Sequence, residues 1–320
     1  MKTDQRWTSL ARLLSVATSL LAIFAIPVLI SGCGNNSNKK ATQQEDATHG
    51  TIRVSVDESF KPVIDSQIKV YQSSYPDAHI IAEYKPEAEC LKDLMNDSVR
   101  MVIVTRGLSQ DETDGLKTKL SFEPQFGLLA FDGVALITNK QAKDSVFSVD
   151  DIKQMLSGNT SYPYKIVLDG VNATSTVRYA IDSILRGQPI SKKTQAAKSS
   201  PGVIDYVAGD PKAIGMIGVS WVGNNDDSTQ LSFLNKIRIA SLRCDYCEGK
   251  PYTKPYQANL ATSRYPLRRG LYYILKENFT GVGTGLMNFM VYERGQLIFK
   301  SAYLLPARMN FDVRQATLSQ

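Results

Sequence analysis

The stretch that decides the fold is TIRVSVDESFKPVIDSQIKVY, residues 51–71. Its first seven residues alternate Ile52, Val54 and Val56 with polar side chains, and this period of two is typical of a strand. The rest places apolar residues at helical spacing after Ser59, with a proline where the first turn of a helix tolerates one. We therefore predict a strand, a short loop and a helix.

The same unit recurs along the chain. Further strands are predicted at 79–84, 100–105, 132–139 and 164–170, and helices at 88–96, after Ser148 and after Thr174. Alternation of this kind gives an α/β fold with a mostly parallel sheet, in which ligands collect at the carboxyl ends of the strands. About 270 residues follow residue 50, which is more than one core usually holds, so we expect two lobes.

The N-terminal region is typical of an export signal. Three basic residues among the first twelve precede an uncharged run at 13–30, which ends in Ser31-Gly32 before Cys33. Ile30 to Cys33 resembles a bacterial lipobox, in which the cysteine is lipidated. We predict a lipoprotein signal peptide at 1–32 and a flexible polar tether at 33–50. The alternatives are a retained membrane anchor and an ordinary cysteine at a signal end.

Composition limits the possible functions. From Cys33 onward there are 34 basic and 30 acidic residues (37 less 3, and 31 less 1), a net charge of +4 without a long block, which excludes a typical nucleic-acid binder. With His49 and His79 as the only histidines, no zinc site is predicted. Common nucleophile, metalloprotease and phosphate-loop motifs are missing, and GVGTG at 281–285 favours a turn or close packing. We expect no enzyme, no metal and no cofactor.

The cysteine pair in CDYC lies between loop-forming residues. Cys244 and Cys247 can close a small loop in an oxidising compartment, which leaves Cys90 unpaired. A redox site is the alternative, because vicinal cysteines can lower a thiol pKa at a helix start.

Hydroxyl groups crowd the predicted helix start at Thr174, Ser175 and Thr176. Free backbone N–H groups and hydroxyls at a helix start suit an anion. Simple capping by Thr174 or Ser175 is the alternative.

Five segments, taken in order, resemble the substrate-binding lipoprotein of ABC-type phosphate importers: ESFKPVID, NATSTVRYAIDSI, VIDYVAGDPKAIGMIGVSW, SRYPLRRGLYYILK and LMNFMVYERGQLIFKSAYLLPA. The resemblance implies a two-lobed periplasmic-binding-protein fold of type II, with mixed, mostly parallel sheets and hinge crossovers. We expect lobe 1 at 51–131 and 243–320 and lobe 2 at 132–242, with closure around a ligand.

The family holds its anion with hydroxyls and amides at two helix starts, one arginine and one acid. The resemblance assigns the first helix start to Ser59 and Phe60 and the second to Thr174, Ser175 and Thr176.

The charged positions depart from the family. Thr105 and Arg106 stand where the family has its acid, and Gly170, beside Asp169, stands where it has its arginine. Our hypothesis is that Arg106 supplies the cation and Asp169 the acceptor, with Arg178 as a second candidate cation. The alternatives are a turn residue for Asp169 and a surface residue for Arg178. Arg268 and Arg269 are interpreted as a solvated charged face, and a permease-contact surface is the alternative.

The resemblance implies a monomeric lipoprotein, lipid-anchored on the extracytoplasmic (periplasmic) face of a bacterial membrane. It is expected to capture inorganic phosphate and deliver it to ABC permease subunits. The alternatives are another oxyanion, such as sulfate, molybdate or a phosphonate, or an orphan sensory or scaffold lipoprotein of the envelope.

Overall fold

The computed structural model describes residues 44–159, 161–170, 174–224 and 226–309. The predicted signal peptide and Cys33 lie outside these residues. The chain from Gln44 onward forms a compact unit by itself. Over the ranges described, no helix combines the length and the apolar character needed to cross a membrane.

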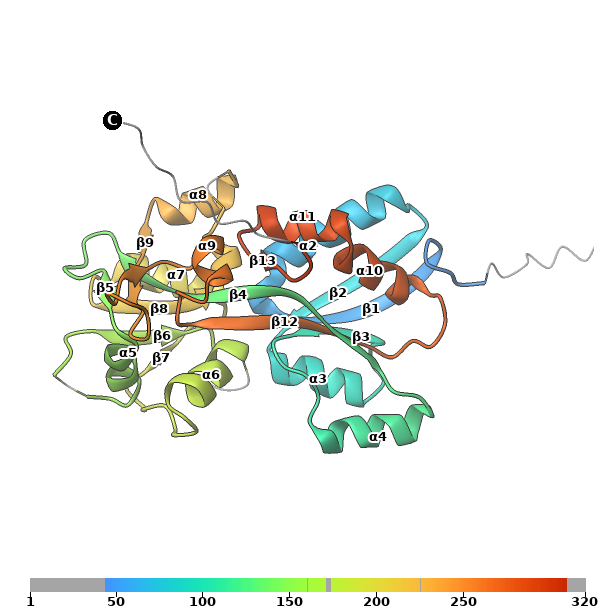
Figure 1. Ribbon diagram of the computed structural model, residues 1–320, viewed down its shortest axis with the longest axis horizontal. Coiled ribbons are helices and arrows are strands. Elements are labelled where there is room, and N and C mark those ends of the chain that lie inside the picture. The colour runs from blue at the N-terminus through green and yellow to red at the C-terminus, as the bar shows by residue number, and fades with distance from the viewer. Residues whose placement is uncertain (1–43, 160, 171–173, 225, 310–320) are drawn as a thin grey trace, which may run out of the picture. The chain divides into compact units, whose positions relative to one another are not determined.

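Lobe 1 is built on the strand that the sequence predicted first, β1 (Gly50–Asp57). It pairs in parallel with β2 (Ala78–Lys85) and β3 (Met101–Val104), and β12 (Arg268–Leu275) and the first part of β4 (Gln125–Asn139) complete the sheet. One face is covered by α2 (Lys61–Ser74), α10 (Val282–Val291) and α11 (Glu293–Ser301), and the other by α3 (Glu87–Met95) and α4 (Gln110–Leu120) (Figure 1). A short 3-10 turn, η1 (Glu58–Phe60), joins β1 to α2.

Lobe 2 surrounds the second part of β4. Its sheet continues with β8 (Ala213–Gly218), β6 (Lys165–Leu168) and β7 (Gln195–Ala196), and β9 (Ile237–Ile239) also pairs with β4. Alternate residues of β8 face opposite layers, as the period of a strand requires. The helical elements are α5 (Val149–Leu156), α6 (Ser175–Tyr179) with the π-helical turn η2 (Ala180–Ile184), α7 (Ser200–Gly209), η3 (Val219–Trp221), α8 (Ser228–Leu234) and α9 (Gln257–Ala261).

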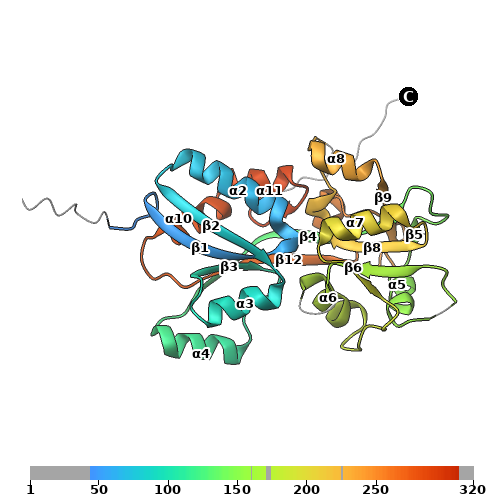
Figure 2. The same ribbon diagram turned by 180° about the vertical axis from the view of Figure 1, so that it is seen from behind.

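Strands β4 and β12 connect the lobes. Residues 125–133 of β4 pair with β12, whereas residues 134–138 pair with β8, so one strand belongs to both sheets (Figures 1 and 2). The strand predicted at 132–139 therefore starts earlier, at Gln125, because its first part is paired with β12. The short strand β13 (Leu305–Pro306) also pairs with β4. The predicted two-lobed α/β fold with hinge crossovers is confirmed.

Several local predictions match the structure. Pro62 lies in the first turn of α2, and Ser148 and Asp151 form a capping box on α5. The C-terminal segment LMNFMVYERGQLIF, quoted above for the family resemblance, forms parts of two helices, α10 and α11, because Tyr292 between them has an extended backbone.

The lobe boundary differs from the one predicted. The segment 243–267, which the sequence placed in lobe 1, packs with lobe 2. Its strands β10 (Ser241–Arg243) and β11 (Tyr252–Thr253) form a small sheet with β5 (Val146–Phe147). Leu260 and Tyr265 are buried in the lobe 2 core, so the chain returns to lobe 1 only with β12.

The end of the expected tether packs on lobe 1. Arg100 binds the carboxylate of Glu45, with Nη1 3.1 Å from Oε2, and the Tyr71 hydroxyl donates to the carbonyl of Ala47. Residues 44–50 therefore belong to the folded unit rather than to a free segment.

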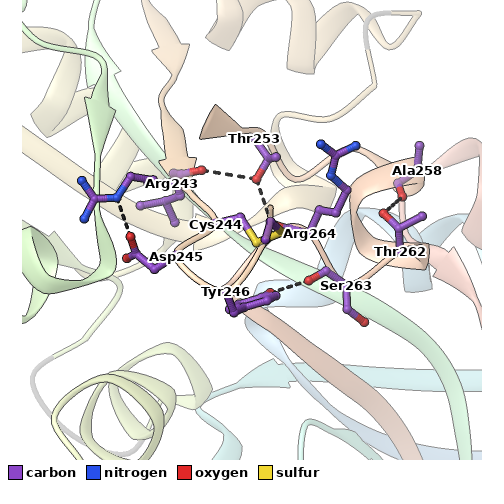
Figure 3. Close-up of a disulfide and its surroundings, with 11 residues drawn as sticks. Arg243, Cys244, Asp245, Tyr246, Thr253, Ala258, Thr262, Ser263 and Arg264 are labelled. Carbon is purple, nitrogen blue, oxygen red and sulfur yellow. Dashed lines mark hydrogen bonds and ion pairs between the residues drawn. A yellow bond between two sulfur atoms is a disulfide. The ribbon is translucent and has the colours of Figure 1, made fainter. Parts of the chain in front are cut away.

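Cys244 and Cys247 form a disulfide in the loop between β10 and β11 (Figure 3). The hydroxyl of Thr253 donates to the carbonyls of Leu242 and Arg264 at 3.3 and 3.1 Å, and the Tyr246 hydroxyl donates to the carbonyl of Ser263. Cys90 is a free thiol in the core of lobe 1. The pair thus closes the small loop that the sequence offered as one of two possibilities.

Candidate ligand site between the lobes

The candidate site lies where the carboxyl ends of strands from both lobes meet. Asp57 ends β1 and caps η1, its Oδ1 accepting from the amide of Ser59 at 2.9 Å. On the other lobe, Thr174 caps α6 and accepts from the amide of Val177 at 3.2 Å. These two caps fix the backbone at both helix starts.

The two helix starts converge. The Ser59 hydroxyl lies 3.4 Å from Asp169 Oδ2 and 3.4 Å from Ser175 Oγ, although these partners belong to lobe 2. The hydroxyls of Thr174 and Thr176 donate to Asp169 Oδ1 and Oδ2, each at 3.0 Å. All five side chains are buried. The structure therefore brings together the hydroxyls that the sequence singled out, and it places Asp169 at their centre.

The cation of this cluster is Arg269, which the sequence interpretation wrongly left on a solvated face. Its side chain is only 3% exposed, and its Nε donates to Asp132, directly opposite on β4, at 2.9 Å. Nη1 donates to Ser175 Oγ at 3.0 Å. The ring of Phe60, the buried residue that precedes α2, has its centroid 5.1 Å from the guanidinium carbon.

Nη2 of Arg269 is buried and has no hydrogen-bond partner among the described residues. Gly218, at the end of β8, faces it closely: a Cβ there would stand 3.3 Å from Nη2 and 3.2 Å from the Ser59 carbonyl. A second buried atom, Asp57 Oδ2, is likewise without a partner in the described ranges. An unused donor and an unused acceptor are thus enclosed in one cluster.

Burial dominates the acid chemistry here. It raises the pKa of Asp57 to about 6, although Arg269 and Ser175 pull the pKa down. Burial also raises the pKa values of Asp132 and Asp169 above their usual range, against the attraction of Arg269. Burial acts against the charge of Arg269, but the nearby carboxylates outweigh it and raise the guanidinium pKa, so this side chain stays charged.

A second set of polar contacts links the lobes farther out. Arg178, on α6, donates from Nε to Glu87 Oε2 at 2.6 Å and from Nη2 to Thr105 Oγ1 at 2.7 Å. The amide and hydroxyl of Thr105 both donate to Glu87 Oε1 at 2.7 Å. Burial alone would raise the pKa of Glu87, but the hydrogen bond and charge of Arg178 outweigh it, and the pKa is lowered. Thr105 and Arg178 therefore serve this pair and not the hydroxyl cluster.

Two further contacts close the lobes on each other. Glu58 accepts from the amide and the hydroxyl of Ser200, at the start of α7, at 3.1 and 3.0 Å. Burial, with Asp169 nearby, raises the pKa of Glu58 to about 7. The Ser220 hydroxyl donates to the carbonyl of Ser59 at 3.0 Å.

Arg106 does not supply the cation of the cluster, contrary to the hypothesis from sequence. Its Nη1 and Nη2 donate to the two carboxylate oxygens of Glu112 at 2.8 and 2.9 Å, and Nη1 also reaches the carbonyl of Gly107. Glu112 is held there because it forms the capping box of α4 with Ser109. Arg106 and Arg178 instead line a cavity of about 280 Å³ beside the Glu87 pair.

A signal for Arg269 was present in the sequence. In β12, the side chains of Arg269, Leu271 and Tyr273 point to one buried face, since a strand has a period of two. The position in the strand thus predicted burial, whereas the residue type suggested a surface. Asp57 was also overlooked, although it ends a strand whose carboxyl end borders the site.

A family model of a PBP (periplasmic binding protein) superfamily domain matches residues 41–294. The chain therefore belongs to the PBP superfamily, whose members include two-lobed binding proteins. No curated protein sequence matches it.

Solved structures with the same fold have low sequence identity to this chain. One structure, from Clostridium perfringens, is described as a phosphate ABC transporter substrate-binding protein with bound phosphate. It is 20% identical to this chain and has a TM-score of 0.66, and the alignment covers 81% of this chain and 100% of the other. An ABC-type phosphate transport receptor from Vibrio cholerae is 16% identical, with a TM-score of 0.57 and coverages of 79% and 99%. The regulatory domain of MetR, a LysR family regulator from N. meningitidis, is 14% identical, with a TM-score of 0.50 and coverages of 80% and 96%. These similarities concern the fold alone, and proteins with different roles share this fold.

Proposed function

We propose that this protein is a substrate-binding protein that captures inorganic phosphate between its lobes and delivers it to an ABC permease. The phosphate proteins from C. perfringens and V. cholerae share the fold and support this assignment. In this role the protein performs no chemistry on its ligand. The two lobes close on phosphate through the strands β4 and β12.

The observation that carries the proposal is the pair of unsatisfied buried atoms beside hydroxyls from both lobes. Within the ranges that the structure describes, Arg269 Nη2 is a charged donor without an acceptor, and Asp57 Oδ2 is an acceptor without a donor. A buried polar atom without a partner is costly, so a ligand that satisfies both is favoured. Phosphate, which keeps one or two protonated oxygens and two or three unprotonated ones near neutral pH, can accept from Arg269 and donate to Asp57.

The same pair argues against sulfate. Sulfate carries no proton at neutral pH, so it cannot donate to Asp57, and the carboxylate repels it. The hydroxyls of Ser59, Thr174, Ser175 and Thr176 are neutral donors that either anion can use. Discrimination therefore falls to Asp57 rather than to the hydroxyl groups.

The cellular location of the protein is proposed from residues 1–33, which lie outside the described ranges. In our proposal, residues 1–32 are removed as a signal peptide, Cys33 is lipidated, and the protein works as a monomer on the extracytoplasmic face of the membrane. A Cys33→Ser variant should lose incorporation of a labelled fatty acid and should leave the membrane fraction. Retention of the label in that variant would contradict the anchor.

Calorimetry on the full-length protein in mild detergent tests the ligand. Phosphate at pH 7 should bind in a saturable manner with one site per chain, and sulfate should bind at least about 100-fold more weakly, the difference of a few kcal/mol that an unsatisfied buried carboxylate costs. Binding of molybdate, sulfate or a phosphonate without phosphate would reassign the ligand within the oxyanions. Absence of binding to all four would favour the sensory or scaffold role.

A further inference from the structure

The carboxylate of Asp169 takes the hydrogen bonds that an anionic ligand would need. Thr174 and Thr176 donate to its two oxygens at 3.0 Å, and Ser59 reaches it from lobe 1 at 3.4 Å. Asp169 is only 4% exposed. The hydroxyl cluster of both helix starts is therefore already occupied by a negatively charged group of the chain itself.

The contacts of Asp169 with Thr174 and Thr176 are local, but its contact with Ser59 is not. The cap of α6 is complete without Asp169, because Thr174 Oγ1 accepts from the amide of Val177. The contact with Ser59 joins residues 110 positions apart, in different lobes. An aspartate that merely shaped its own turn would not be expected to reach across the site.

The charge balance of the cluster points the same way. Among the described residues around Ser175, the carboxylates of Asp57, Asp132 and Asp169 accompany one buried guanidinium, that of Arg269. Asp132 already pairs with Arg269 directly. An anion that entered beside an ionised Asp169 would meet a like charge and find the hydroxyls engaged.

We propose that the Asp169 carboxylate occupies the anion position of the site and acts as an internal competitor of the ligand. In the structure the lobes meet on this side chain, and phosphate binds only when Asp169 gives up the hydroxyls. The part that concerns phosphate rests on the proposed function. Asp169 thereby sets the concentration at which the receptor fills, and it is not the group that accepts the ligand's proton.

The first test compares Asp169→Ala with the unchanged protein and with Asp150→Ala, which removes the same atoms from an exposed position at the start of α5. Calorimetry with inorganic phosphate should show at least a tenfold lower Kd for Asp169→Ala and no change for Asp150→Ala. Asp169→Asn, which keeps the shape and loses the charge, should fall in between. Equal or weaker phosphate binding by both Asp169 variants would overturn the proposal, and Asp169→Asn decides alone if the alanine variant does not fold.

The second test does not depend on phosphate. Formate, a free carboxylate, should fill the space vacated in Asp169→Ala and raise its Tm in a saturable manner, measured against sodium chloride at equal ionic strength. The unchanged protein and Asp150→Ala should show no such rise. A formate response without phosphate binding by any variant would overturn the proposed ligand and support the anion position. Phosphate binding by the unchanged protein without a formate response in Asp169→Ala would overturn the internal competitor.

Discussion

Two sets of polar contacts join the lobes, and they differ in one respect. The inner set surrounds Arg269 and leaves two buried atoms, Arg269 Nη2 and Asp57 Oδ2, without partners in the described structure. The outer set surrounds Arg178, and there Glu87 and Thr105 satisfy each other and the guanidinium. An unsatisfied buried group costs roughly 1–3 kcal/mol, so a protein keeps one where something else completes it.

The difference separates recognition from closure. The outer pair is satisfied by contacts within the chain, so we expect its role to be to hold the lobes together. The inner set has spare donor and acceptor capacity, so its role is to bind. Arg106 belongs to neither set, because Glu112 takes both ends of its guanidinium.

The largest effect is expected from the inner set, with Arg269→Gln. Loss of a charge-assisted donor, in a site where such bonds contribute about 1.5–3 kcal/mol each, should weaken phosphate binding by about 10- to 150-fold. Asp132 would also remain buried and unpaired, which typically lowers the free energy of unfolding by about 3–5 kcal/mol. Calorimetry measures the first effect and urea denaturation the second.

Two controls separate these effects. The double variant Arg269→Gln/Asp132→Asn removes the buried pair together, so it should recover much of the stability and still bind phosphate poorly. Arg268→Gln changes the neighbouring arginine, which lies over the ring of Phe131 with its guanidinium carbon 3.6 Å from the centroid, and should alter affinity less than about threefold. Affinity that returns in the double variant would assign Arg269 to the scaffold.

The next effect concerns the outer set, with Arg178→Gln. Glu87, whose side chain is 3% exposed, would lose its counter-charge, and the free energy of unfolding should fall by about 3 kcal/mol. This lies at the low end for a broken buried pair because Arg178 itself is 32% exposed. Urea denaturation measures the loss, and phosphate affinity should fall less than in Arg269→Gln.

Glu87→Gln completes a double-mutant cycle with Arg178→Gln. If the two side chains act as a pair, the double variant should be more stable than the sum of the single losses predicts. Additive losses would show that Arg178 and Glu87 contribute independently and do not act as an ion pair that joins the lobes.

Sequence reasoning succeeded here where the signal was local. The strand and helix at 51–71 follow from the spacing of their own apolar residues, and the hydroxyl-bearing residues after residue 173 indicated a helix start. The same reasoning failed where a partner lies far away in the chain. The lobe boundary depends on β10 pairing with β5, almost a hundred residues earlier, as in Leu242 with Phe147.

The candidate site shows the same limit. The residue types at Arg106 and Arg269 are identical, and only their surroundings decide which one is buried in the cluster. Arg106 is captured by Glu112 six residues on, whereas Arg269 meets Asp132 through the pairing of β12 with β4. The period of a strand would have placed Arg269 on the buried face of β12, and giving this period more weight than residue type would have identified Arg269.

A smaller effect is expected from Glu58, which contacts lobe 2 at the edge of the inner set. Its pKa rises from 4.5 to about 7 in the folded protein, so the folded state holds the proton more tightly than the unfolded chain does. Stability should therefore decrease as pH rises from about 4.5 to about 7. Glu58→Gln should remove about 2 kcal/mol of this decrease. A fully buried carboxyl with the same change in pKa would contribute more, at about 1.4 kcal/mol per pKa unit, but water reaches part of the Glu58 side chain.

The remaining slope identifies the inner acid. Asp57, whose pKa rises to about 6, still contributes in Glu58→Gln, together with Asp132 and Asp169, whose pKa values burial also raises, so a decrease should remain up to about pH 6 and should be shallower near pH 7 than in the unchanged protein. Glu89→Gln, an exposed position on α3, serves as the control and should leave the profile unchanged. If the stability of Glu58→Gln decreases between pH 6 and 7 as steeply as that of the unchanged protein, a group other than Glu58 titrates in that range.

The smallest effect is expected outside both sets, at the disulfide. Cys244 and Cys247 are three positions apart, so the loop they close restrains few unfolded conformations, and Cys244→Ser/Cys247→Ser should cost about 1–2 kcal/mol. The loop belongs to the small sheet of lobe 2, which is separate from the sheet that contains β4 and β12, so phosphate affinity should stay within about twofold. A larger loss of affinity would show that the small sheet helps to position the inner set, and the division between recognition and closure would then have to include it.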